Sequence, residues 1–421
     1  MYARAGRPDH EIDDVREEAT GYGGRRESPP VDWEPMPFAC TFKQQYGKQF
    51  CVTDCPASPP CGIFEYVRVE RPEDVPPADP LVVDVALLDL NHGWPNLGHD
   101  SLVHTAMDAA CEAIEALEAA DLRVRVLSYD VRRSGVLPEP PGPRFSLYLG
   151  TGGPGHIDPR GNDGVAPEAQ GIREDPGWEA PAFRLFDAIL ADEASALLGV
   201  CHTFGTLCRW SGAAQPVLRS PEKGKCTGVL ENVLSDSARE HPWFRHFAAR
   251  LGEEGRLRVV ENRLFDLIPA PGGFPAGVEP MGWETLGVGG PRGDAVTMLE
   301  FARDPGGVVP RVFAVNHHPE IVDRFRQVMI LGQKRDRGEV SEEWYQERLE
   351  ILTGSLPDDD VDRALHLTSD FTLLGPLRFH LFRQIRGRVE SHGRRTGLHE
   401  GRVLQAVGGE SVEVERAAEA F

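Results

Sequence analysis

The sequence has a shortage of basic residues and no long hydrophobic run. Lysine and arginine together number 45 against 66 aspartates and glutamates in 421 residues, a formal net charge of −21. This charge repels phosphates, so we expect neither nucleic acid nor an anionic membrane as a partner. There is no basic segment followed by an apolar core at the N-terminus, and no apolar run of membrane-spanning length. These absences favour a cytoplasmic protein and leave small polar substrates and protein partners open.

Cysteine is also scarce, with eight in the chain, too few for a disulfide scaffold of this length. Four of them lie close together in a proline-rich segment: Cys40, Cys51, Cys55 and Cys61. Four thiolates satisfy a tetrahedral metal site, so these residues are candidates for binding zinc or an iron–sulfur cluster. Their spacing matches no common zinc finger, and four reduced thiols without a metal are the alternative.

Composition divides the chain into five segments, and no internal repeat is present. The first is charged and poor in apolar residues, which is typical of disorder, and the second is rich in proline and cysteine, with one expected strand at Ile63–Val69. The expected segments are a disordered arm (1–34), a cysteine- and proline-rich segment (35–80), a main domain (81–325), a helical extension (326–390) and a flexible tail (391–421).

Strand and helix patterns alternate in the main domain, which predicts an α/β fold. The run Leu81–Leu90 is almost wholly apolar, as in a parallel strand buried on both faces. The order of elements, β-α-β-β-α-β, implies a mostly parallel sheet flanked by helices, with ligands at the carboxyl ends of the strands. Further strands are expected at 123–129, 145–149, 194–200 and 311–316, and helices at 101–117, with Ser101 as a possible cap, and at 182–191.

A single cysteine, Cys201, stands between an expected strand and a helix-like segment. A side chain at a sharp strand-to-helix turn projects outward, and the amides at a helix N-terminus favour a thiolate over a thiol. The turn therefore predicts a nucleophile. A buried structural thiol is the alternative, because free cysteine is one of the most buried residue types.

A glycine-rich turn follows the strand 145–149. The spacing Gly150-x-Gly152-x-x-Gly155 matches a dinucleotide-binding pattern, but that pattern opens directly into a helix, whereas Pro154 and a long loop follow here. The turn fits better as a set of backbone amides that face a developing oxyanion, because a Cβ would block the approach. The loop 154–178 is long enough to have a function of its own.

The third motif is His318-Pro319-Glu320, at the end of the strand 311–316. A cysteine nucleophile needs a base, and the base works best when a third group orients it. A histidine and a glutamate one proline apart supply both from one turn, although a surface loop has the same composition. Alternation along the strand places His317 on the opposite face, so we expect it to be structural or exposed to solvent.

Together the three motifs resemble those of the class I glutamine amidotransferase superfamily. The resemblance covers 81–324 and implies a flavodoxin-like α/β fold. The matching residues are Gly152-Gly153-Pro154-Gly155, Gly199-Val200-Cys201 and His318-Pro319-Glu320, and Val260–Pro269 resembles the family segment that precedes the histidine.

The resemblance implies a thioester mechanism that needs no cofactor. Cys201 would attack a carboxamide carbon, His318 would take the thiol proton and pass it to the leaving ammonia, and Glu320 would orient His318. The backbone amides of His202 and of Gly152 or Gly153 would hold the oxyanion. The expected substrate is glutamine or a related γ-glutamyl amide.

The chain departs from the family's usual Cys-x-Gly-x-Gln pattern, because Thr203 and Gly205 stand at its last two specified positions. A thioester hydrolase or acyltransferase on the same scaffold, or a catalytically silent binding or regulatory protein, are therefore alternatives. Cys201-His202 also resembles the intracellular protease and deglycase group, in which His202 would be the catalytic partner. No ATP pyrophosphatase loop or Walker lysine loop follows the main domain, so a separate synthetase is the expected acceptor of any ammonia.

Overall fold

The computed structural model describes residues 63–94, 96–220, 225–353 and 359–396. These residues all belong to one unit of the chain, Pro37–Phe421. The predicted arm 1–34, the four clustered cysteines and most of the predicted tail lie outside them. Within these ranges, no helix is long and apolar enough to cross a membrane.

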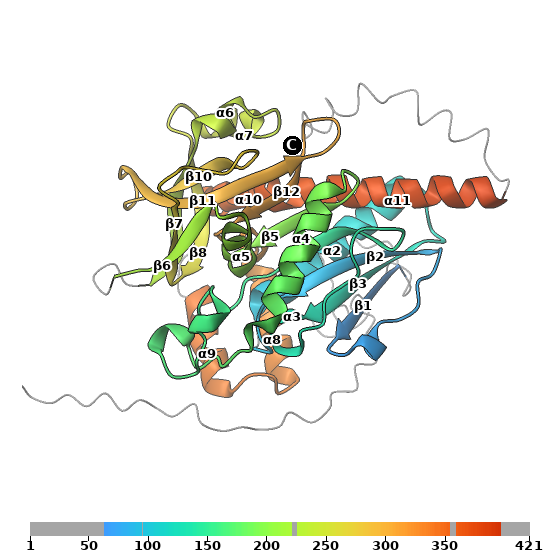
Figure 1. Ribbon diagram of the computed structural model, residues 1–421, viewed down its shortest axis with the longest axis horizontal. Helices are drawn as coiled ribbons and strands as arrows, with labels where there is room; N and C mark the ends of the chain where they lie inside the picture. The colour runs from blue at the N-terminus through green and yellow to red at the C-terminus, as the bar shows by residue number, and fades with distance from the viewer. Residues whose placement is uncertain (1–62, 95, 221–224, 354–358, 397–421) are drawn as a thin grey trace, which may run out of the picture. The chain divides into compact units, whose positions relative to one another are not determined.

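The core of the fold is a ten-stranded sheet (Figure 1). Its strands are β1 (Phe64–Val69), β2 (Val82–Asp89), β3 (Arg123–Asp130), β4 (Phe145–Gly150), β5 (Ala196–Val200), β7 (Cys226–Leu234), β8 (Arg256–Arg263), β10 (Glu279–Thr285), β11 (Arg292–Arg303) and β12 (Pro310–Val315). They lie in the order β1-β3-β2-β4-β5-β12-β11-β10-β7-β8. Two further strands, β6 (Ala214–Leu218) and β9 (Phe265–Pro269), pair with each other.

The first six strands of this order are parallel, and β11, β10, β7 and β8 continue the sheet with antiparallel pairing. The order β3-β2-β4-β5-β12 is the flavodoxin-like order 2-1-3-4-5. All eight residues of β2 are buried, as expected for a central parallel strand. The predicted fold class is therefore confirmed, and β1 extends the sheet from within the segment 35–80.

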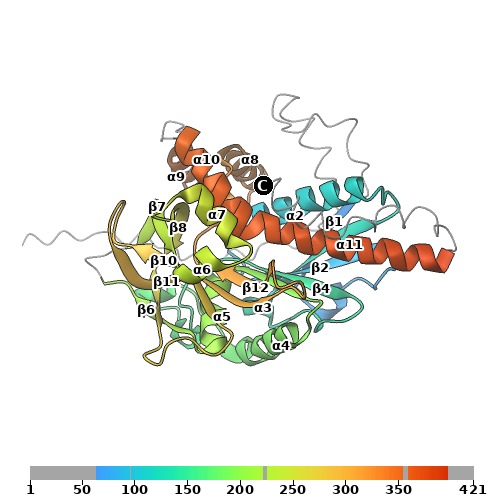
Figure 2. The same ribbon diagram turned by 90° about the horizontal axis from the view of Figure 1, so that it is seen from above.

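Helices cover both faces of the sheet, with α2, α7 and α11 on one face and α4 and α5 on the other (Figure 2). The helices are α2 (Leu97–Ala116), α3 (Val131–Ser134), α4 (Glu179–Ala191), α5 (His202–Ser211), α6 (Asp236–Glu240), α7 (Phe244–Leu251), α8 (Arg324–Asp336), α9 (Glu342–Thr353), α10 (Asp359–Ser369) and α11 (Gly375–Thr396). A π-helical turn, Asp370–Leu374, joins α10 to α11.

The expected cap of α2 was wrong. The helix begins at Leu97, and the side chain of Asn96 accepts hydrogen bonds from the amides of Gly98 and His99 at 2.6 and 3.3 Å. An asparagine cap satisfies the amides of the first turn, which have no partner within the helix. Ser101 is instead buried inside the helix and accepts a hydrogen bond from Nε2 of Gln327 at 2.6 Å.

The helical extension is packed into the core of the sheet. Five apolar side chains of the π turn and α11 belong to the same buried cluster as residues of β2, β5 and β12: Phe371, Leu373, Leu377, Leu381 and Ile385. At the end of α10, the hydroxyl of Ser369 donates to the carbonyl of Pro319 at 2.6 Å. The extension therefore also supports the turn that follows β12.

Candidate active site

The three predicted motifs meet at one edge of the sheet. They follow β4, β5 and β12, which are neighbouring parallel strands. Gly150 pairs with Gly199, and Val200 pairs with Val315, so the three strands end side by side. The carboxyl ends of parallel strands are where open α/β sheets bind their ligands.

Cys201 occupies a sharp turn between β5 and α5. Its backbone has φ 49° and ψ −98°, a conformation that residues with a side chain rarely adopt. Its amide donates to the carbonyl of Val315 at 2.8 Å, which ties the turn to the end of β12. Strained backbone of this kind holds a nucleophile outward at the start of a helix.

His318 and Glu320 form a buried pair beside this turn. Nδ1 of His318 lies 2.8 Å from Oε1 of Glu320, and the amide of His318 donates to the carbonyl of Val260 at 2.8 Å. Burial by itself lowers the pKa of His318, but the charge of Glu320 and the thiol of Cys201 outweigh it and raise this pKa well above its usual value. Within the described chain, Nε2 of His318 has no other hydrogen-bond partner.

Gly152 lies directly against both reactive side chains. A Cβ built at Gly152 would be 3.1 Å from Cε1 of His318, 3.3 Å from Cβ of Cys201 and 3.7 Å from its Sγ. A substituent here would therefore contact the side chains of both Cys201 and His318. Among the described residues, the amides of Gly152, Gly153 and His202 have no hydrogen-bond acceptor. They can therefore serve as donors to an oxyanion.

Gly153 must be a glycine because the backbone passes too close to the end of β2. A Cβ at Gly153 would lie 2.1 Å from the carbonyl oxygen of Leu90. Nη1 of Arg132 donates to that same carbonyl at 2.8 Å and to the carbonyl of Pro154 at 2.7 Å. One guanidinium group therefore ties the glycine turn to the end of β2.

The same arginine anchors the loop 154–178. Nε and Nη2 of Arg132 donate to the carboxylate of Glu174 at 2.8 and 2.7 Å, and both side chains are 0% exposed. Glu174 also accepts from Asn162 and Trp178, each at 2.7 Å. The loop is thus held by a buried ion pair with additional hydrogen bonds, an arrangement that motif analysis missed because its members are 42 residues apart.

Thr203, the first departure from the family pattern, joins the nucleophile turn to the glycine turn. Its amide and its hydroxyl both donate to the carbonyl of Thr151, at 3.2 and 2.8 Å. Two glycines provide the space for its side chain, because a Cβ at Gly150 or Gly199 would lie 2.4 or 2.7 Å from its methyl group. The threonine and the two glycines therefore fit together as one unit.

Gly205, the second departure, lies under the loop 154–178. A Cβ at Gly205 would come within 2.6 Å of Cδ1 of Ile157. Ile157 therefore takes the space in which a side chain at position 205 would begin.

Glu320 lies at the first turn of α2. A Cβ at Gly98 would be 2.6 Å from Oε1 of Glu320, so glycine at this position leaves room for the carboxylate. The positive end of a helix stabilises a negative charge at its first turn. The glycine two residues after Asn96 was not singled out in the sequence, where it has no motif around it.

His202 and His317, the other histidines next to the two motifs, are both buried and neither is bonded to Cys201. Burial, then the charge of Arg132, lowers the pKa of His202 well below its usual value, and a hydrogen bond with the backbone of Gly153 acts in the opposite direction. Nε2 of His202 has no partner among the described residues, and neither ring nitrogen is bonded to Cys201. This geometry does not fit His202 as the base. His317 is buried, with Nε2 3.4 Å from the hydroxyl of Thr372, and burial lowers its pKa to about 3.

Two other predicted sites have different outcomes. After β4 the chain runs through three single turns of 3-10 helix before α4, so the pattern Gly150–Gly155 does not open into a helix and the dinucleotide interpretation fails. Within the described ranges, no group of three or more histidine, cysteine and acidic side chains could hold a metal ion. The cluster Cys40, Cys51, Cys55 and Cys61 lies outside those ranges, and its metal binding stays a prediction.

No protein-family model and no curated protein matches the chain. Solved structures do match it. A protein named SMU.1228c covers 73% of this chain and 99% of its own, with 14% identity and a TM-score of 0.36. PurLQS from Thermotoga maritima covers 59% and 96%, with 15% identity and a TM-score of 0.31. The glutaminase domain of Trypanosoma brucei CTPS with bound acivicin covers 56% and 86%, with 11% identity and a TM-score of 0.34. Similarity at these scores gives no information about the chemistry of the site, for which the residues described above are the evidence.

Proposed function

We propose that the chain is a cysteine-dependent glutamine amidotransferase-type enzyme that acts on the carboxamide of glutamine or of a related γ-glutamyl compound. One observation carries the proposal. Cys201 and His318 lie on either side of Gly152, and His318 is bonded at its far nitrogen to the buried carboxylate of Glu320. A nucleophile, a base and a group that orients the base are the three parts of a cysteine amidase.

In the first half-reaction, His318 accepts the thiol proton of Cys201 at Nε2, and the sulfur attacks the carboxamide carbon. The amides of Gly152, Gly153 and His202 are the donors available to the oxygen that becomes negative. The carbon–nitrogen bond then breaks, His318 returns the proton to the leaving nitrogen, and ammonia departs. The acyl group remains on sulfur as a thioester.

In the second half-reaction, a water molecule gives its proton to His318 and attacks the thioester carbon. The carbon–sulfur bond breaks, the thiolate regains the proton from His318, and a free carboxylic acid is released. Glu320 keeps the proton of His318 on the side of Nδ1 throughout, so that Nε2 is the atom that exchanges protons. The ammonia leaves to solvent or to an acceptor on a partner synthetase.

The environment of Gly205 bears on which amide the site accepts as substrate. With Ile157 packed over this position, no side chain from it is available to hold the amino acid part of glutamine. A γ-glutamyl amide with a different head group is therefore as good a candidate as glutamine. Both share the carboxamide and the thioester step, so the same assay serves for both.

The test is release of ammonia from glutamine and from a panel of γ-glutamyl amides by the full-length protein. We expect turnover that disappears, by at least a hundredfold, in Cys201→Ala and in His318→Ala. The matched control is Cys208→Ala. This free cysteine lies on the same helix α5 but is fully buried, and burial raises the pKa of its thiol well above the usual value.

Cys208→Ala should keep near-normal turnover. Unchanged turnover in both Cys201→Ala and His318→Ala contradicts the proposed roles. Absence of ammonia release from every amide in the panel contradicts the proposed reaction.

A further inference from the structure

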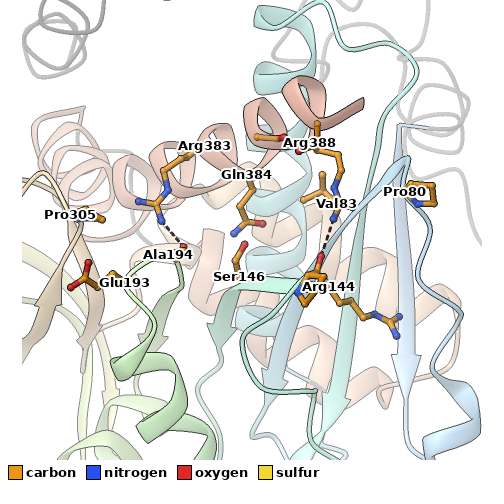
Figure 3. A pocket seen from close by; sticks show the side chains of 13 residues that line it. Pro80, Val83, Arg144, Ser146, Glu193, Ala194, Pro305, Arg383, Gln384 and Arg388 are labelled. Carbon is orange, nitrogen blue, oxygen red and sulfur yellow. Dashed lines mark hydrogen bonds between the residues drawn. The ribbon is translucent and has the colours of Figure 1, made fainter. Parts of the chain in front are cut away.

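A hollow lies at the end of the sheet where the parallel strands β2 and β4 begin (Figure 3). Cys201 follows the opposite end of the parallel strand β5. It has a volume of about 640 Å³. Its walls come from the starts of β2 and β4, the segment before β5 and one side of α11. Its polar lining residues are Arg144, Ser146, Glu193, Arg383, Gln384, Arg388 and Ser391. This volume lies within the range of small-molecule sites, roughly 300–1,000 Å³.

One sector of α11 faces this hollow. At 3.6 residues per turn, each residue advances about 100° around the helix, so Arg383 and Arg388 are about 140° apart. Gly387 and Gln384 fall between these two arginines in the same projection. Figure 3 shows the same arrangement, with the amide of Gln384 between the two guanidinium groups and close to Ser146. The helix therefore presents a cation at each side of the hollow and a polar group at its centre.

The two arginines differ from most of the described arginines in forming no salt bridge with a carboxylate. Burial lowers the pKa of Arg383, while the charges of Asp304 and Asp192 act in the opposite direction. Arg383 donates to the carbonyl of Ala194 at 2.5 Å, and Arg388 donates to the carbonyl of Pro143 at 3.3 Å. Across the described ranges, neither guanidinium lies within salt-bridge distance of an acidic side chain. Arg144, in the same hollow, is by contrast held by its neighbouring carboxylates and contributes no free charge.

Two uncharged polar side chains at the centre of the hollow are also able to form hydrogen bonds with a ligand. Within the part of the chain that the structure describes, neither the hydroxyl of Ser146 nor the amide of Gln384 makes a hydrogen bond. Glu193 is the acidic residue among those lining the hollow. Among the lining residues themselves, two guanidinium groups that form no salt bridge stand against one carboxylate, although Asp304 and Asp192 lie close enough for their charges to act on Arg383.

We propose that this hollow is a binding site for a small organic polyanion that carries phosphate or carboxylate groups. Guanidinium groups recognise both kinds of group through paired hydrogen bonds. Arg383 and Arg388 would each hold an anionic group of the ligand, with Ser146 and Gln384 donating between them. The site is separate from the proposed amidase site and does not depend on it.

Substitutions at Gly387 test whether a ligand occupies the hollow without removing either arginine. A Cβ built at this position has nothing within 4 Å, so the helix has open space there. A leucine at this position would begin in open space on the side of the helix that lies between the two arginines. Gly387→Ala is the matched control, because it improves helix propensity and adds a single carbon.

The experiment is calorimetric titration of the full-length protein with pyrophosphate, ADP and citrate. At least one of these should bind. We expect Arg383→Gln and Arg388→Gln each to weaken binding at least tenfold, since a charged hydrogen bond is lost, and Gly387→Leu to abolish it. Arg386→Gln, a charge removal three residues along α11 and outside the hollow, should leave the affinity unchanged.

Binding of pyrophosphate and ADP without citrate identifies a phosphate ligand, and the reverse identifies a carboxylate ligand. Either result supports the proposal. Absence of binding by all three probes overturns it. Binding that Gly387→Leu and the two hollow-facing variants leave unaltered, or that Arg386→Gln weakens as much as they do, overturns it as well.

Discussion

At the scale of single residues, Thr203 stands where the Cys-x-Gly-x-Gln pattern has a glycine, and its side chain makes contacts that a glycine could not make. Its hydroxyl bonds the carbonyl of Thr151, one residue before Gly152, and its methyl group fills space left by Gly150 and Gly199. The sequence shows the substitution but not its fit, because the fit depends on three strands that meet only in the folded chain. The altered pattern is therefore compatible with an intact nucleophile turn.

The hydrogen bond of Thr203 can be tested alone. Thr203→Val keeps the shape but leaves the buried carbonyl of Thr151 with one donor fewer, so we expect a loss of about 1–3 kcal/mol in the free energy of unfolding. Urea unfolding measures this loss, and ammonia release measures the accompanying fall in kcat. Thr203→Ser, which keeps the hydroxyl, should retain more of both. Equal free energies of unfolding and equal kcat values in the two variants would show that the hydroxyl has no role in the turn.

Glu320 should make a contribution to the free energy of unfolding that decreases as pH rises. It raises the pKa of His318 above its usual value of about 6.5, although burial opposes this. Protonated His318 then stabilises the folded state, fully below the unfolded pKa and decreasingly as pH rises through the folded pKa. We expect Glu320→Gln to cost more stability at pH 6 than at pH 9, as measured by urea unfolding.

The control for this effect is the same substitution made in His318→Gln, where no imidazole titrates. There the cost of Glu320→Gln should vary much less with pH. A cost that is equal at both pH values in the protein with His318 would contradict the role of Glu320 as its charge partner.

At the scale of elements, local pattern predicted the parallel core well. The expected strand at Leu81–Leu90 appears as β2, and the expected helix at 182–191 appears within α4. In the antiparallel half of the sheet, the sequence at 227–297 has short and mixed periods, which indicate strands and turns but not their order. That order, β11-β10-β7-β8, depends on pairings between distant strands with bulges in their register, which periodicity does not encode.

The sequence could not predict how the loop 154–178 is held against the rest of the fold. Arg132 and Glu174 lie in segments with no motif, yet both are 0% exposed and bonded to each other. Arg132→Met would leave a buried carboxylate without its partner, which typically costs about 3–5 kcal/mol. We expect that loss in urea unfolding, together with faster proteolysis within the loop.

The second variant in this test is Arg132→Met combined with Glu174→Gln. It removes the uncompensated charge while an amide can still bond Asn162 or Trp178. It should recover part of the lost stability. A double variant that is no more stable than Arg132→Met would mean that the charge pair is not the source of the effect.

At the scale of the whole molecule, α11 and the π turn before it share one core with the sheet. Leu377, Leu381 and Ile385 of α11 are fully buried, and Ser369 bonds the turn that carries His318 and Glu320. The sequence predicts a helical extension at 326–390 after the main domain. The packing makes it part of the structure that holds the site.

A shortened chain tests this dependence. A chain that ends at Asp323 lacks α8 to α11 and would expose the apolar face that they cover, so we expect it to aggregate or to lack a cooperative unfolding transition. A chain that ends at Thr396 keeps every described helix and should unfold cooperatively near the temperature of the full chain. Cooperative unfolding of the shorter chain would contradict the shared core.

The most direct test of the central claim is the mass of the protein after reaction with γ-glutamyl amides and rapid acid quenching. The account predicts a γ-glutamyl group on one cysteine, mapped to Cys201, absent from Cys208 and lost in Cys201→Ala. Intact-mass and peptide analysis would show it. A protein that releases ammonia without an acyl group ever appearing on Cys201, or that carries the group on another cysteine, would contradict the account.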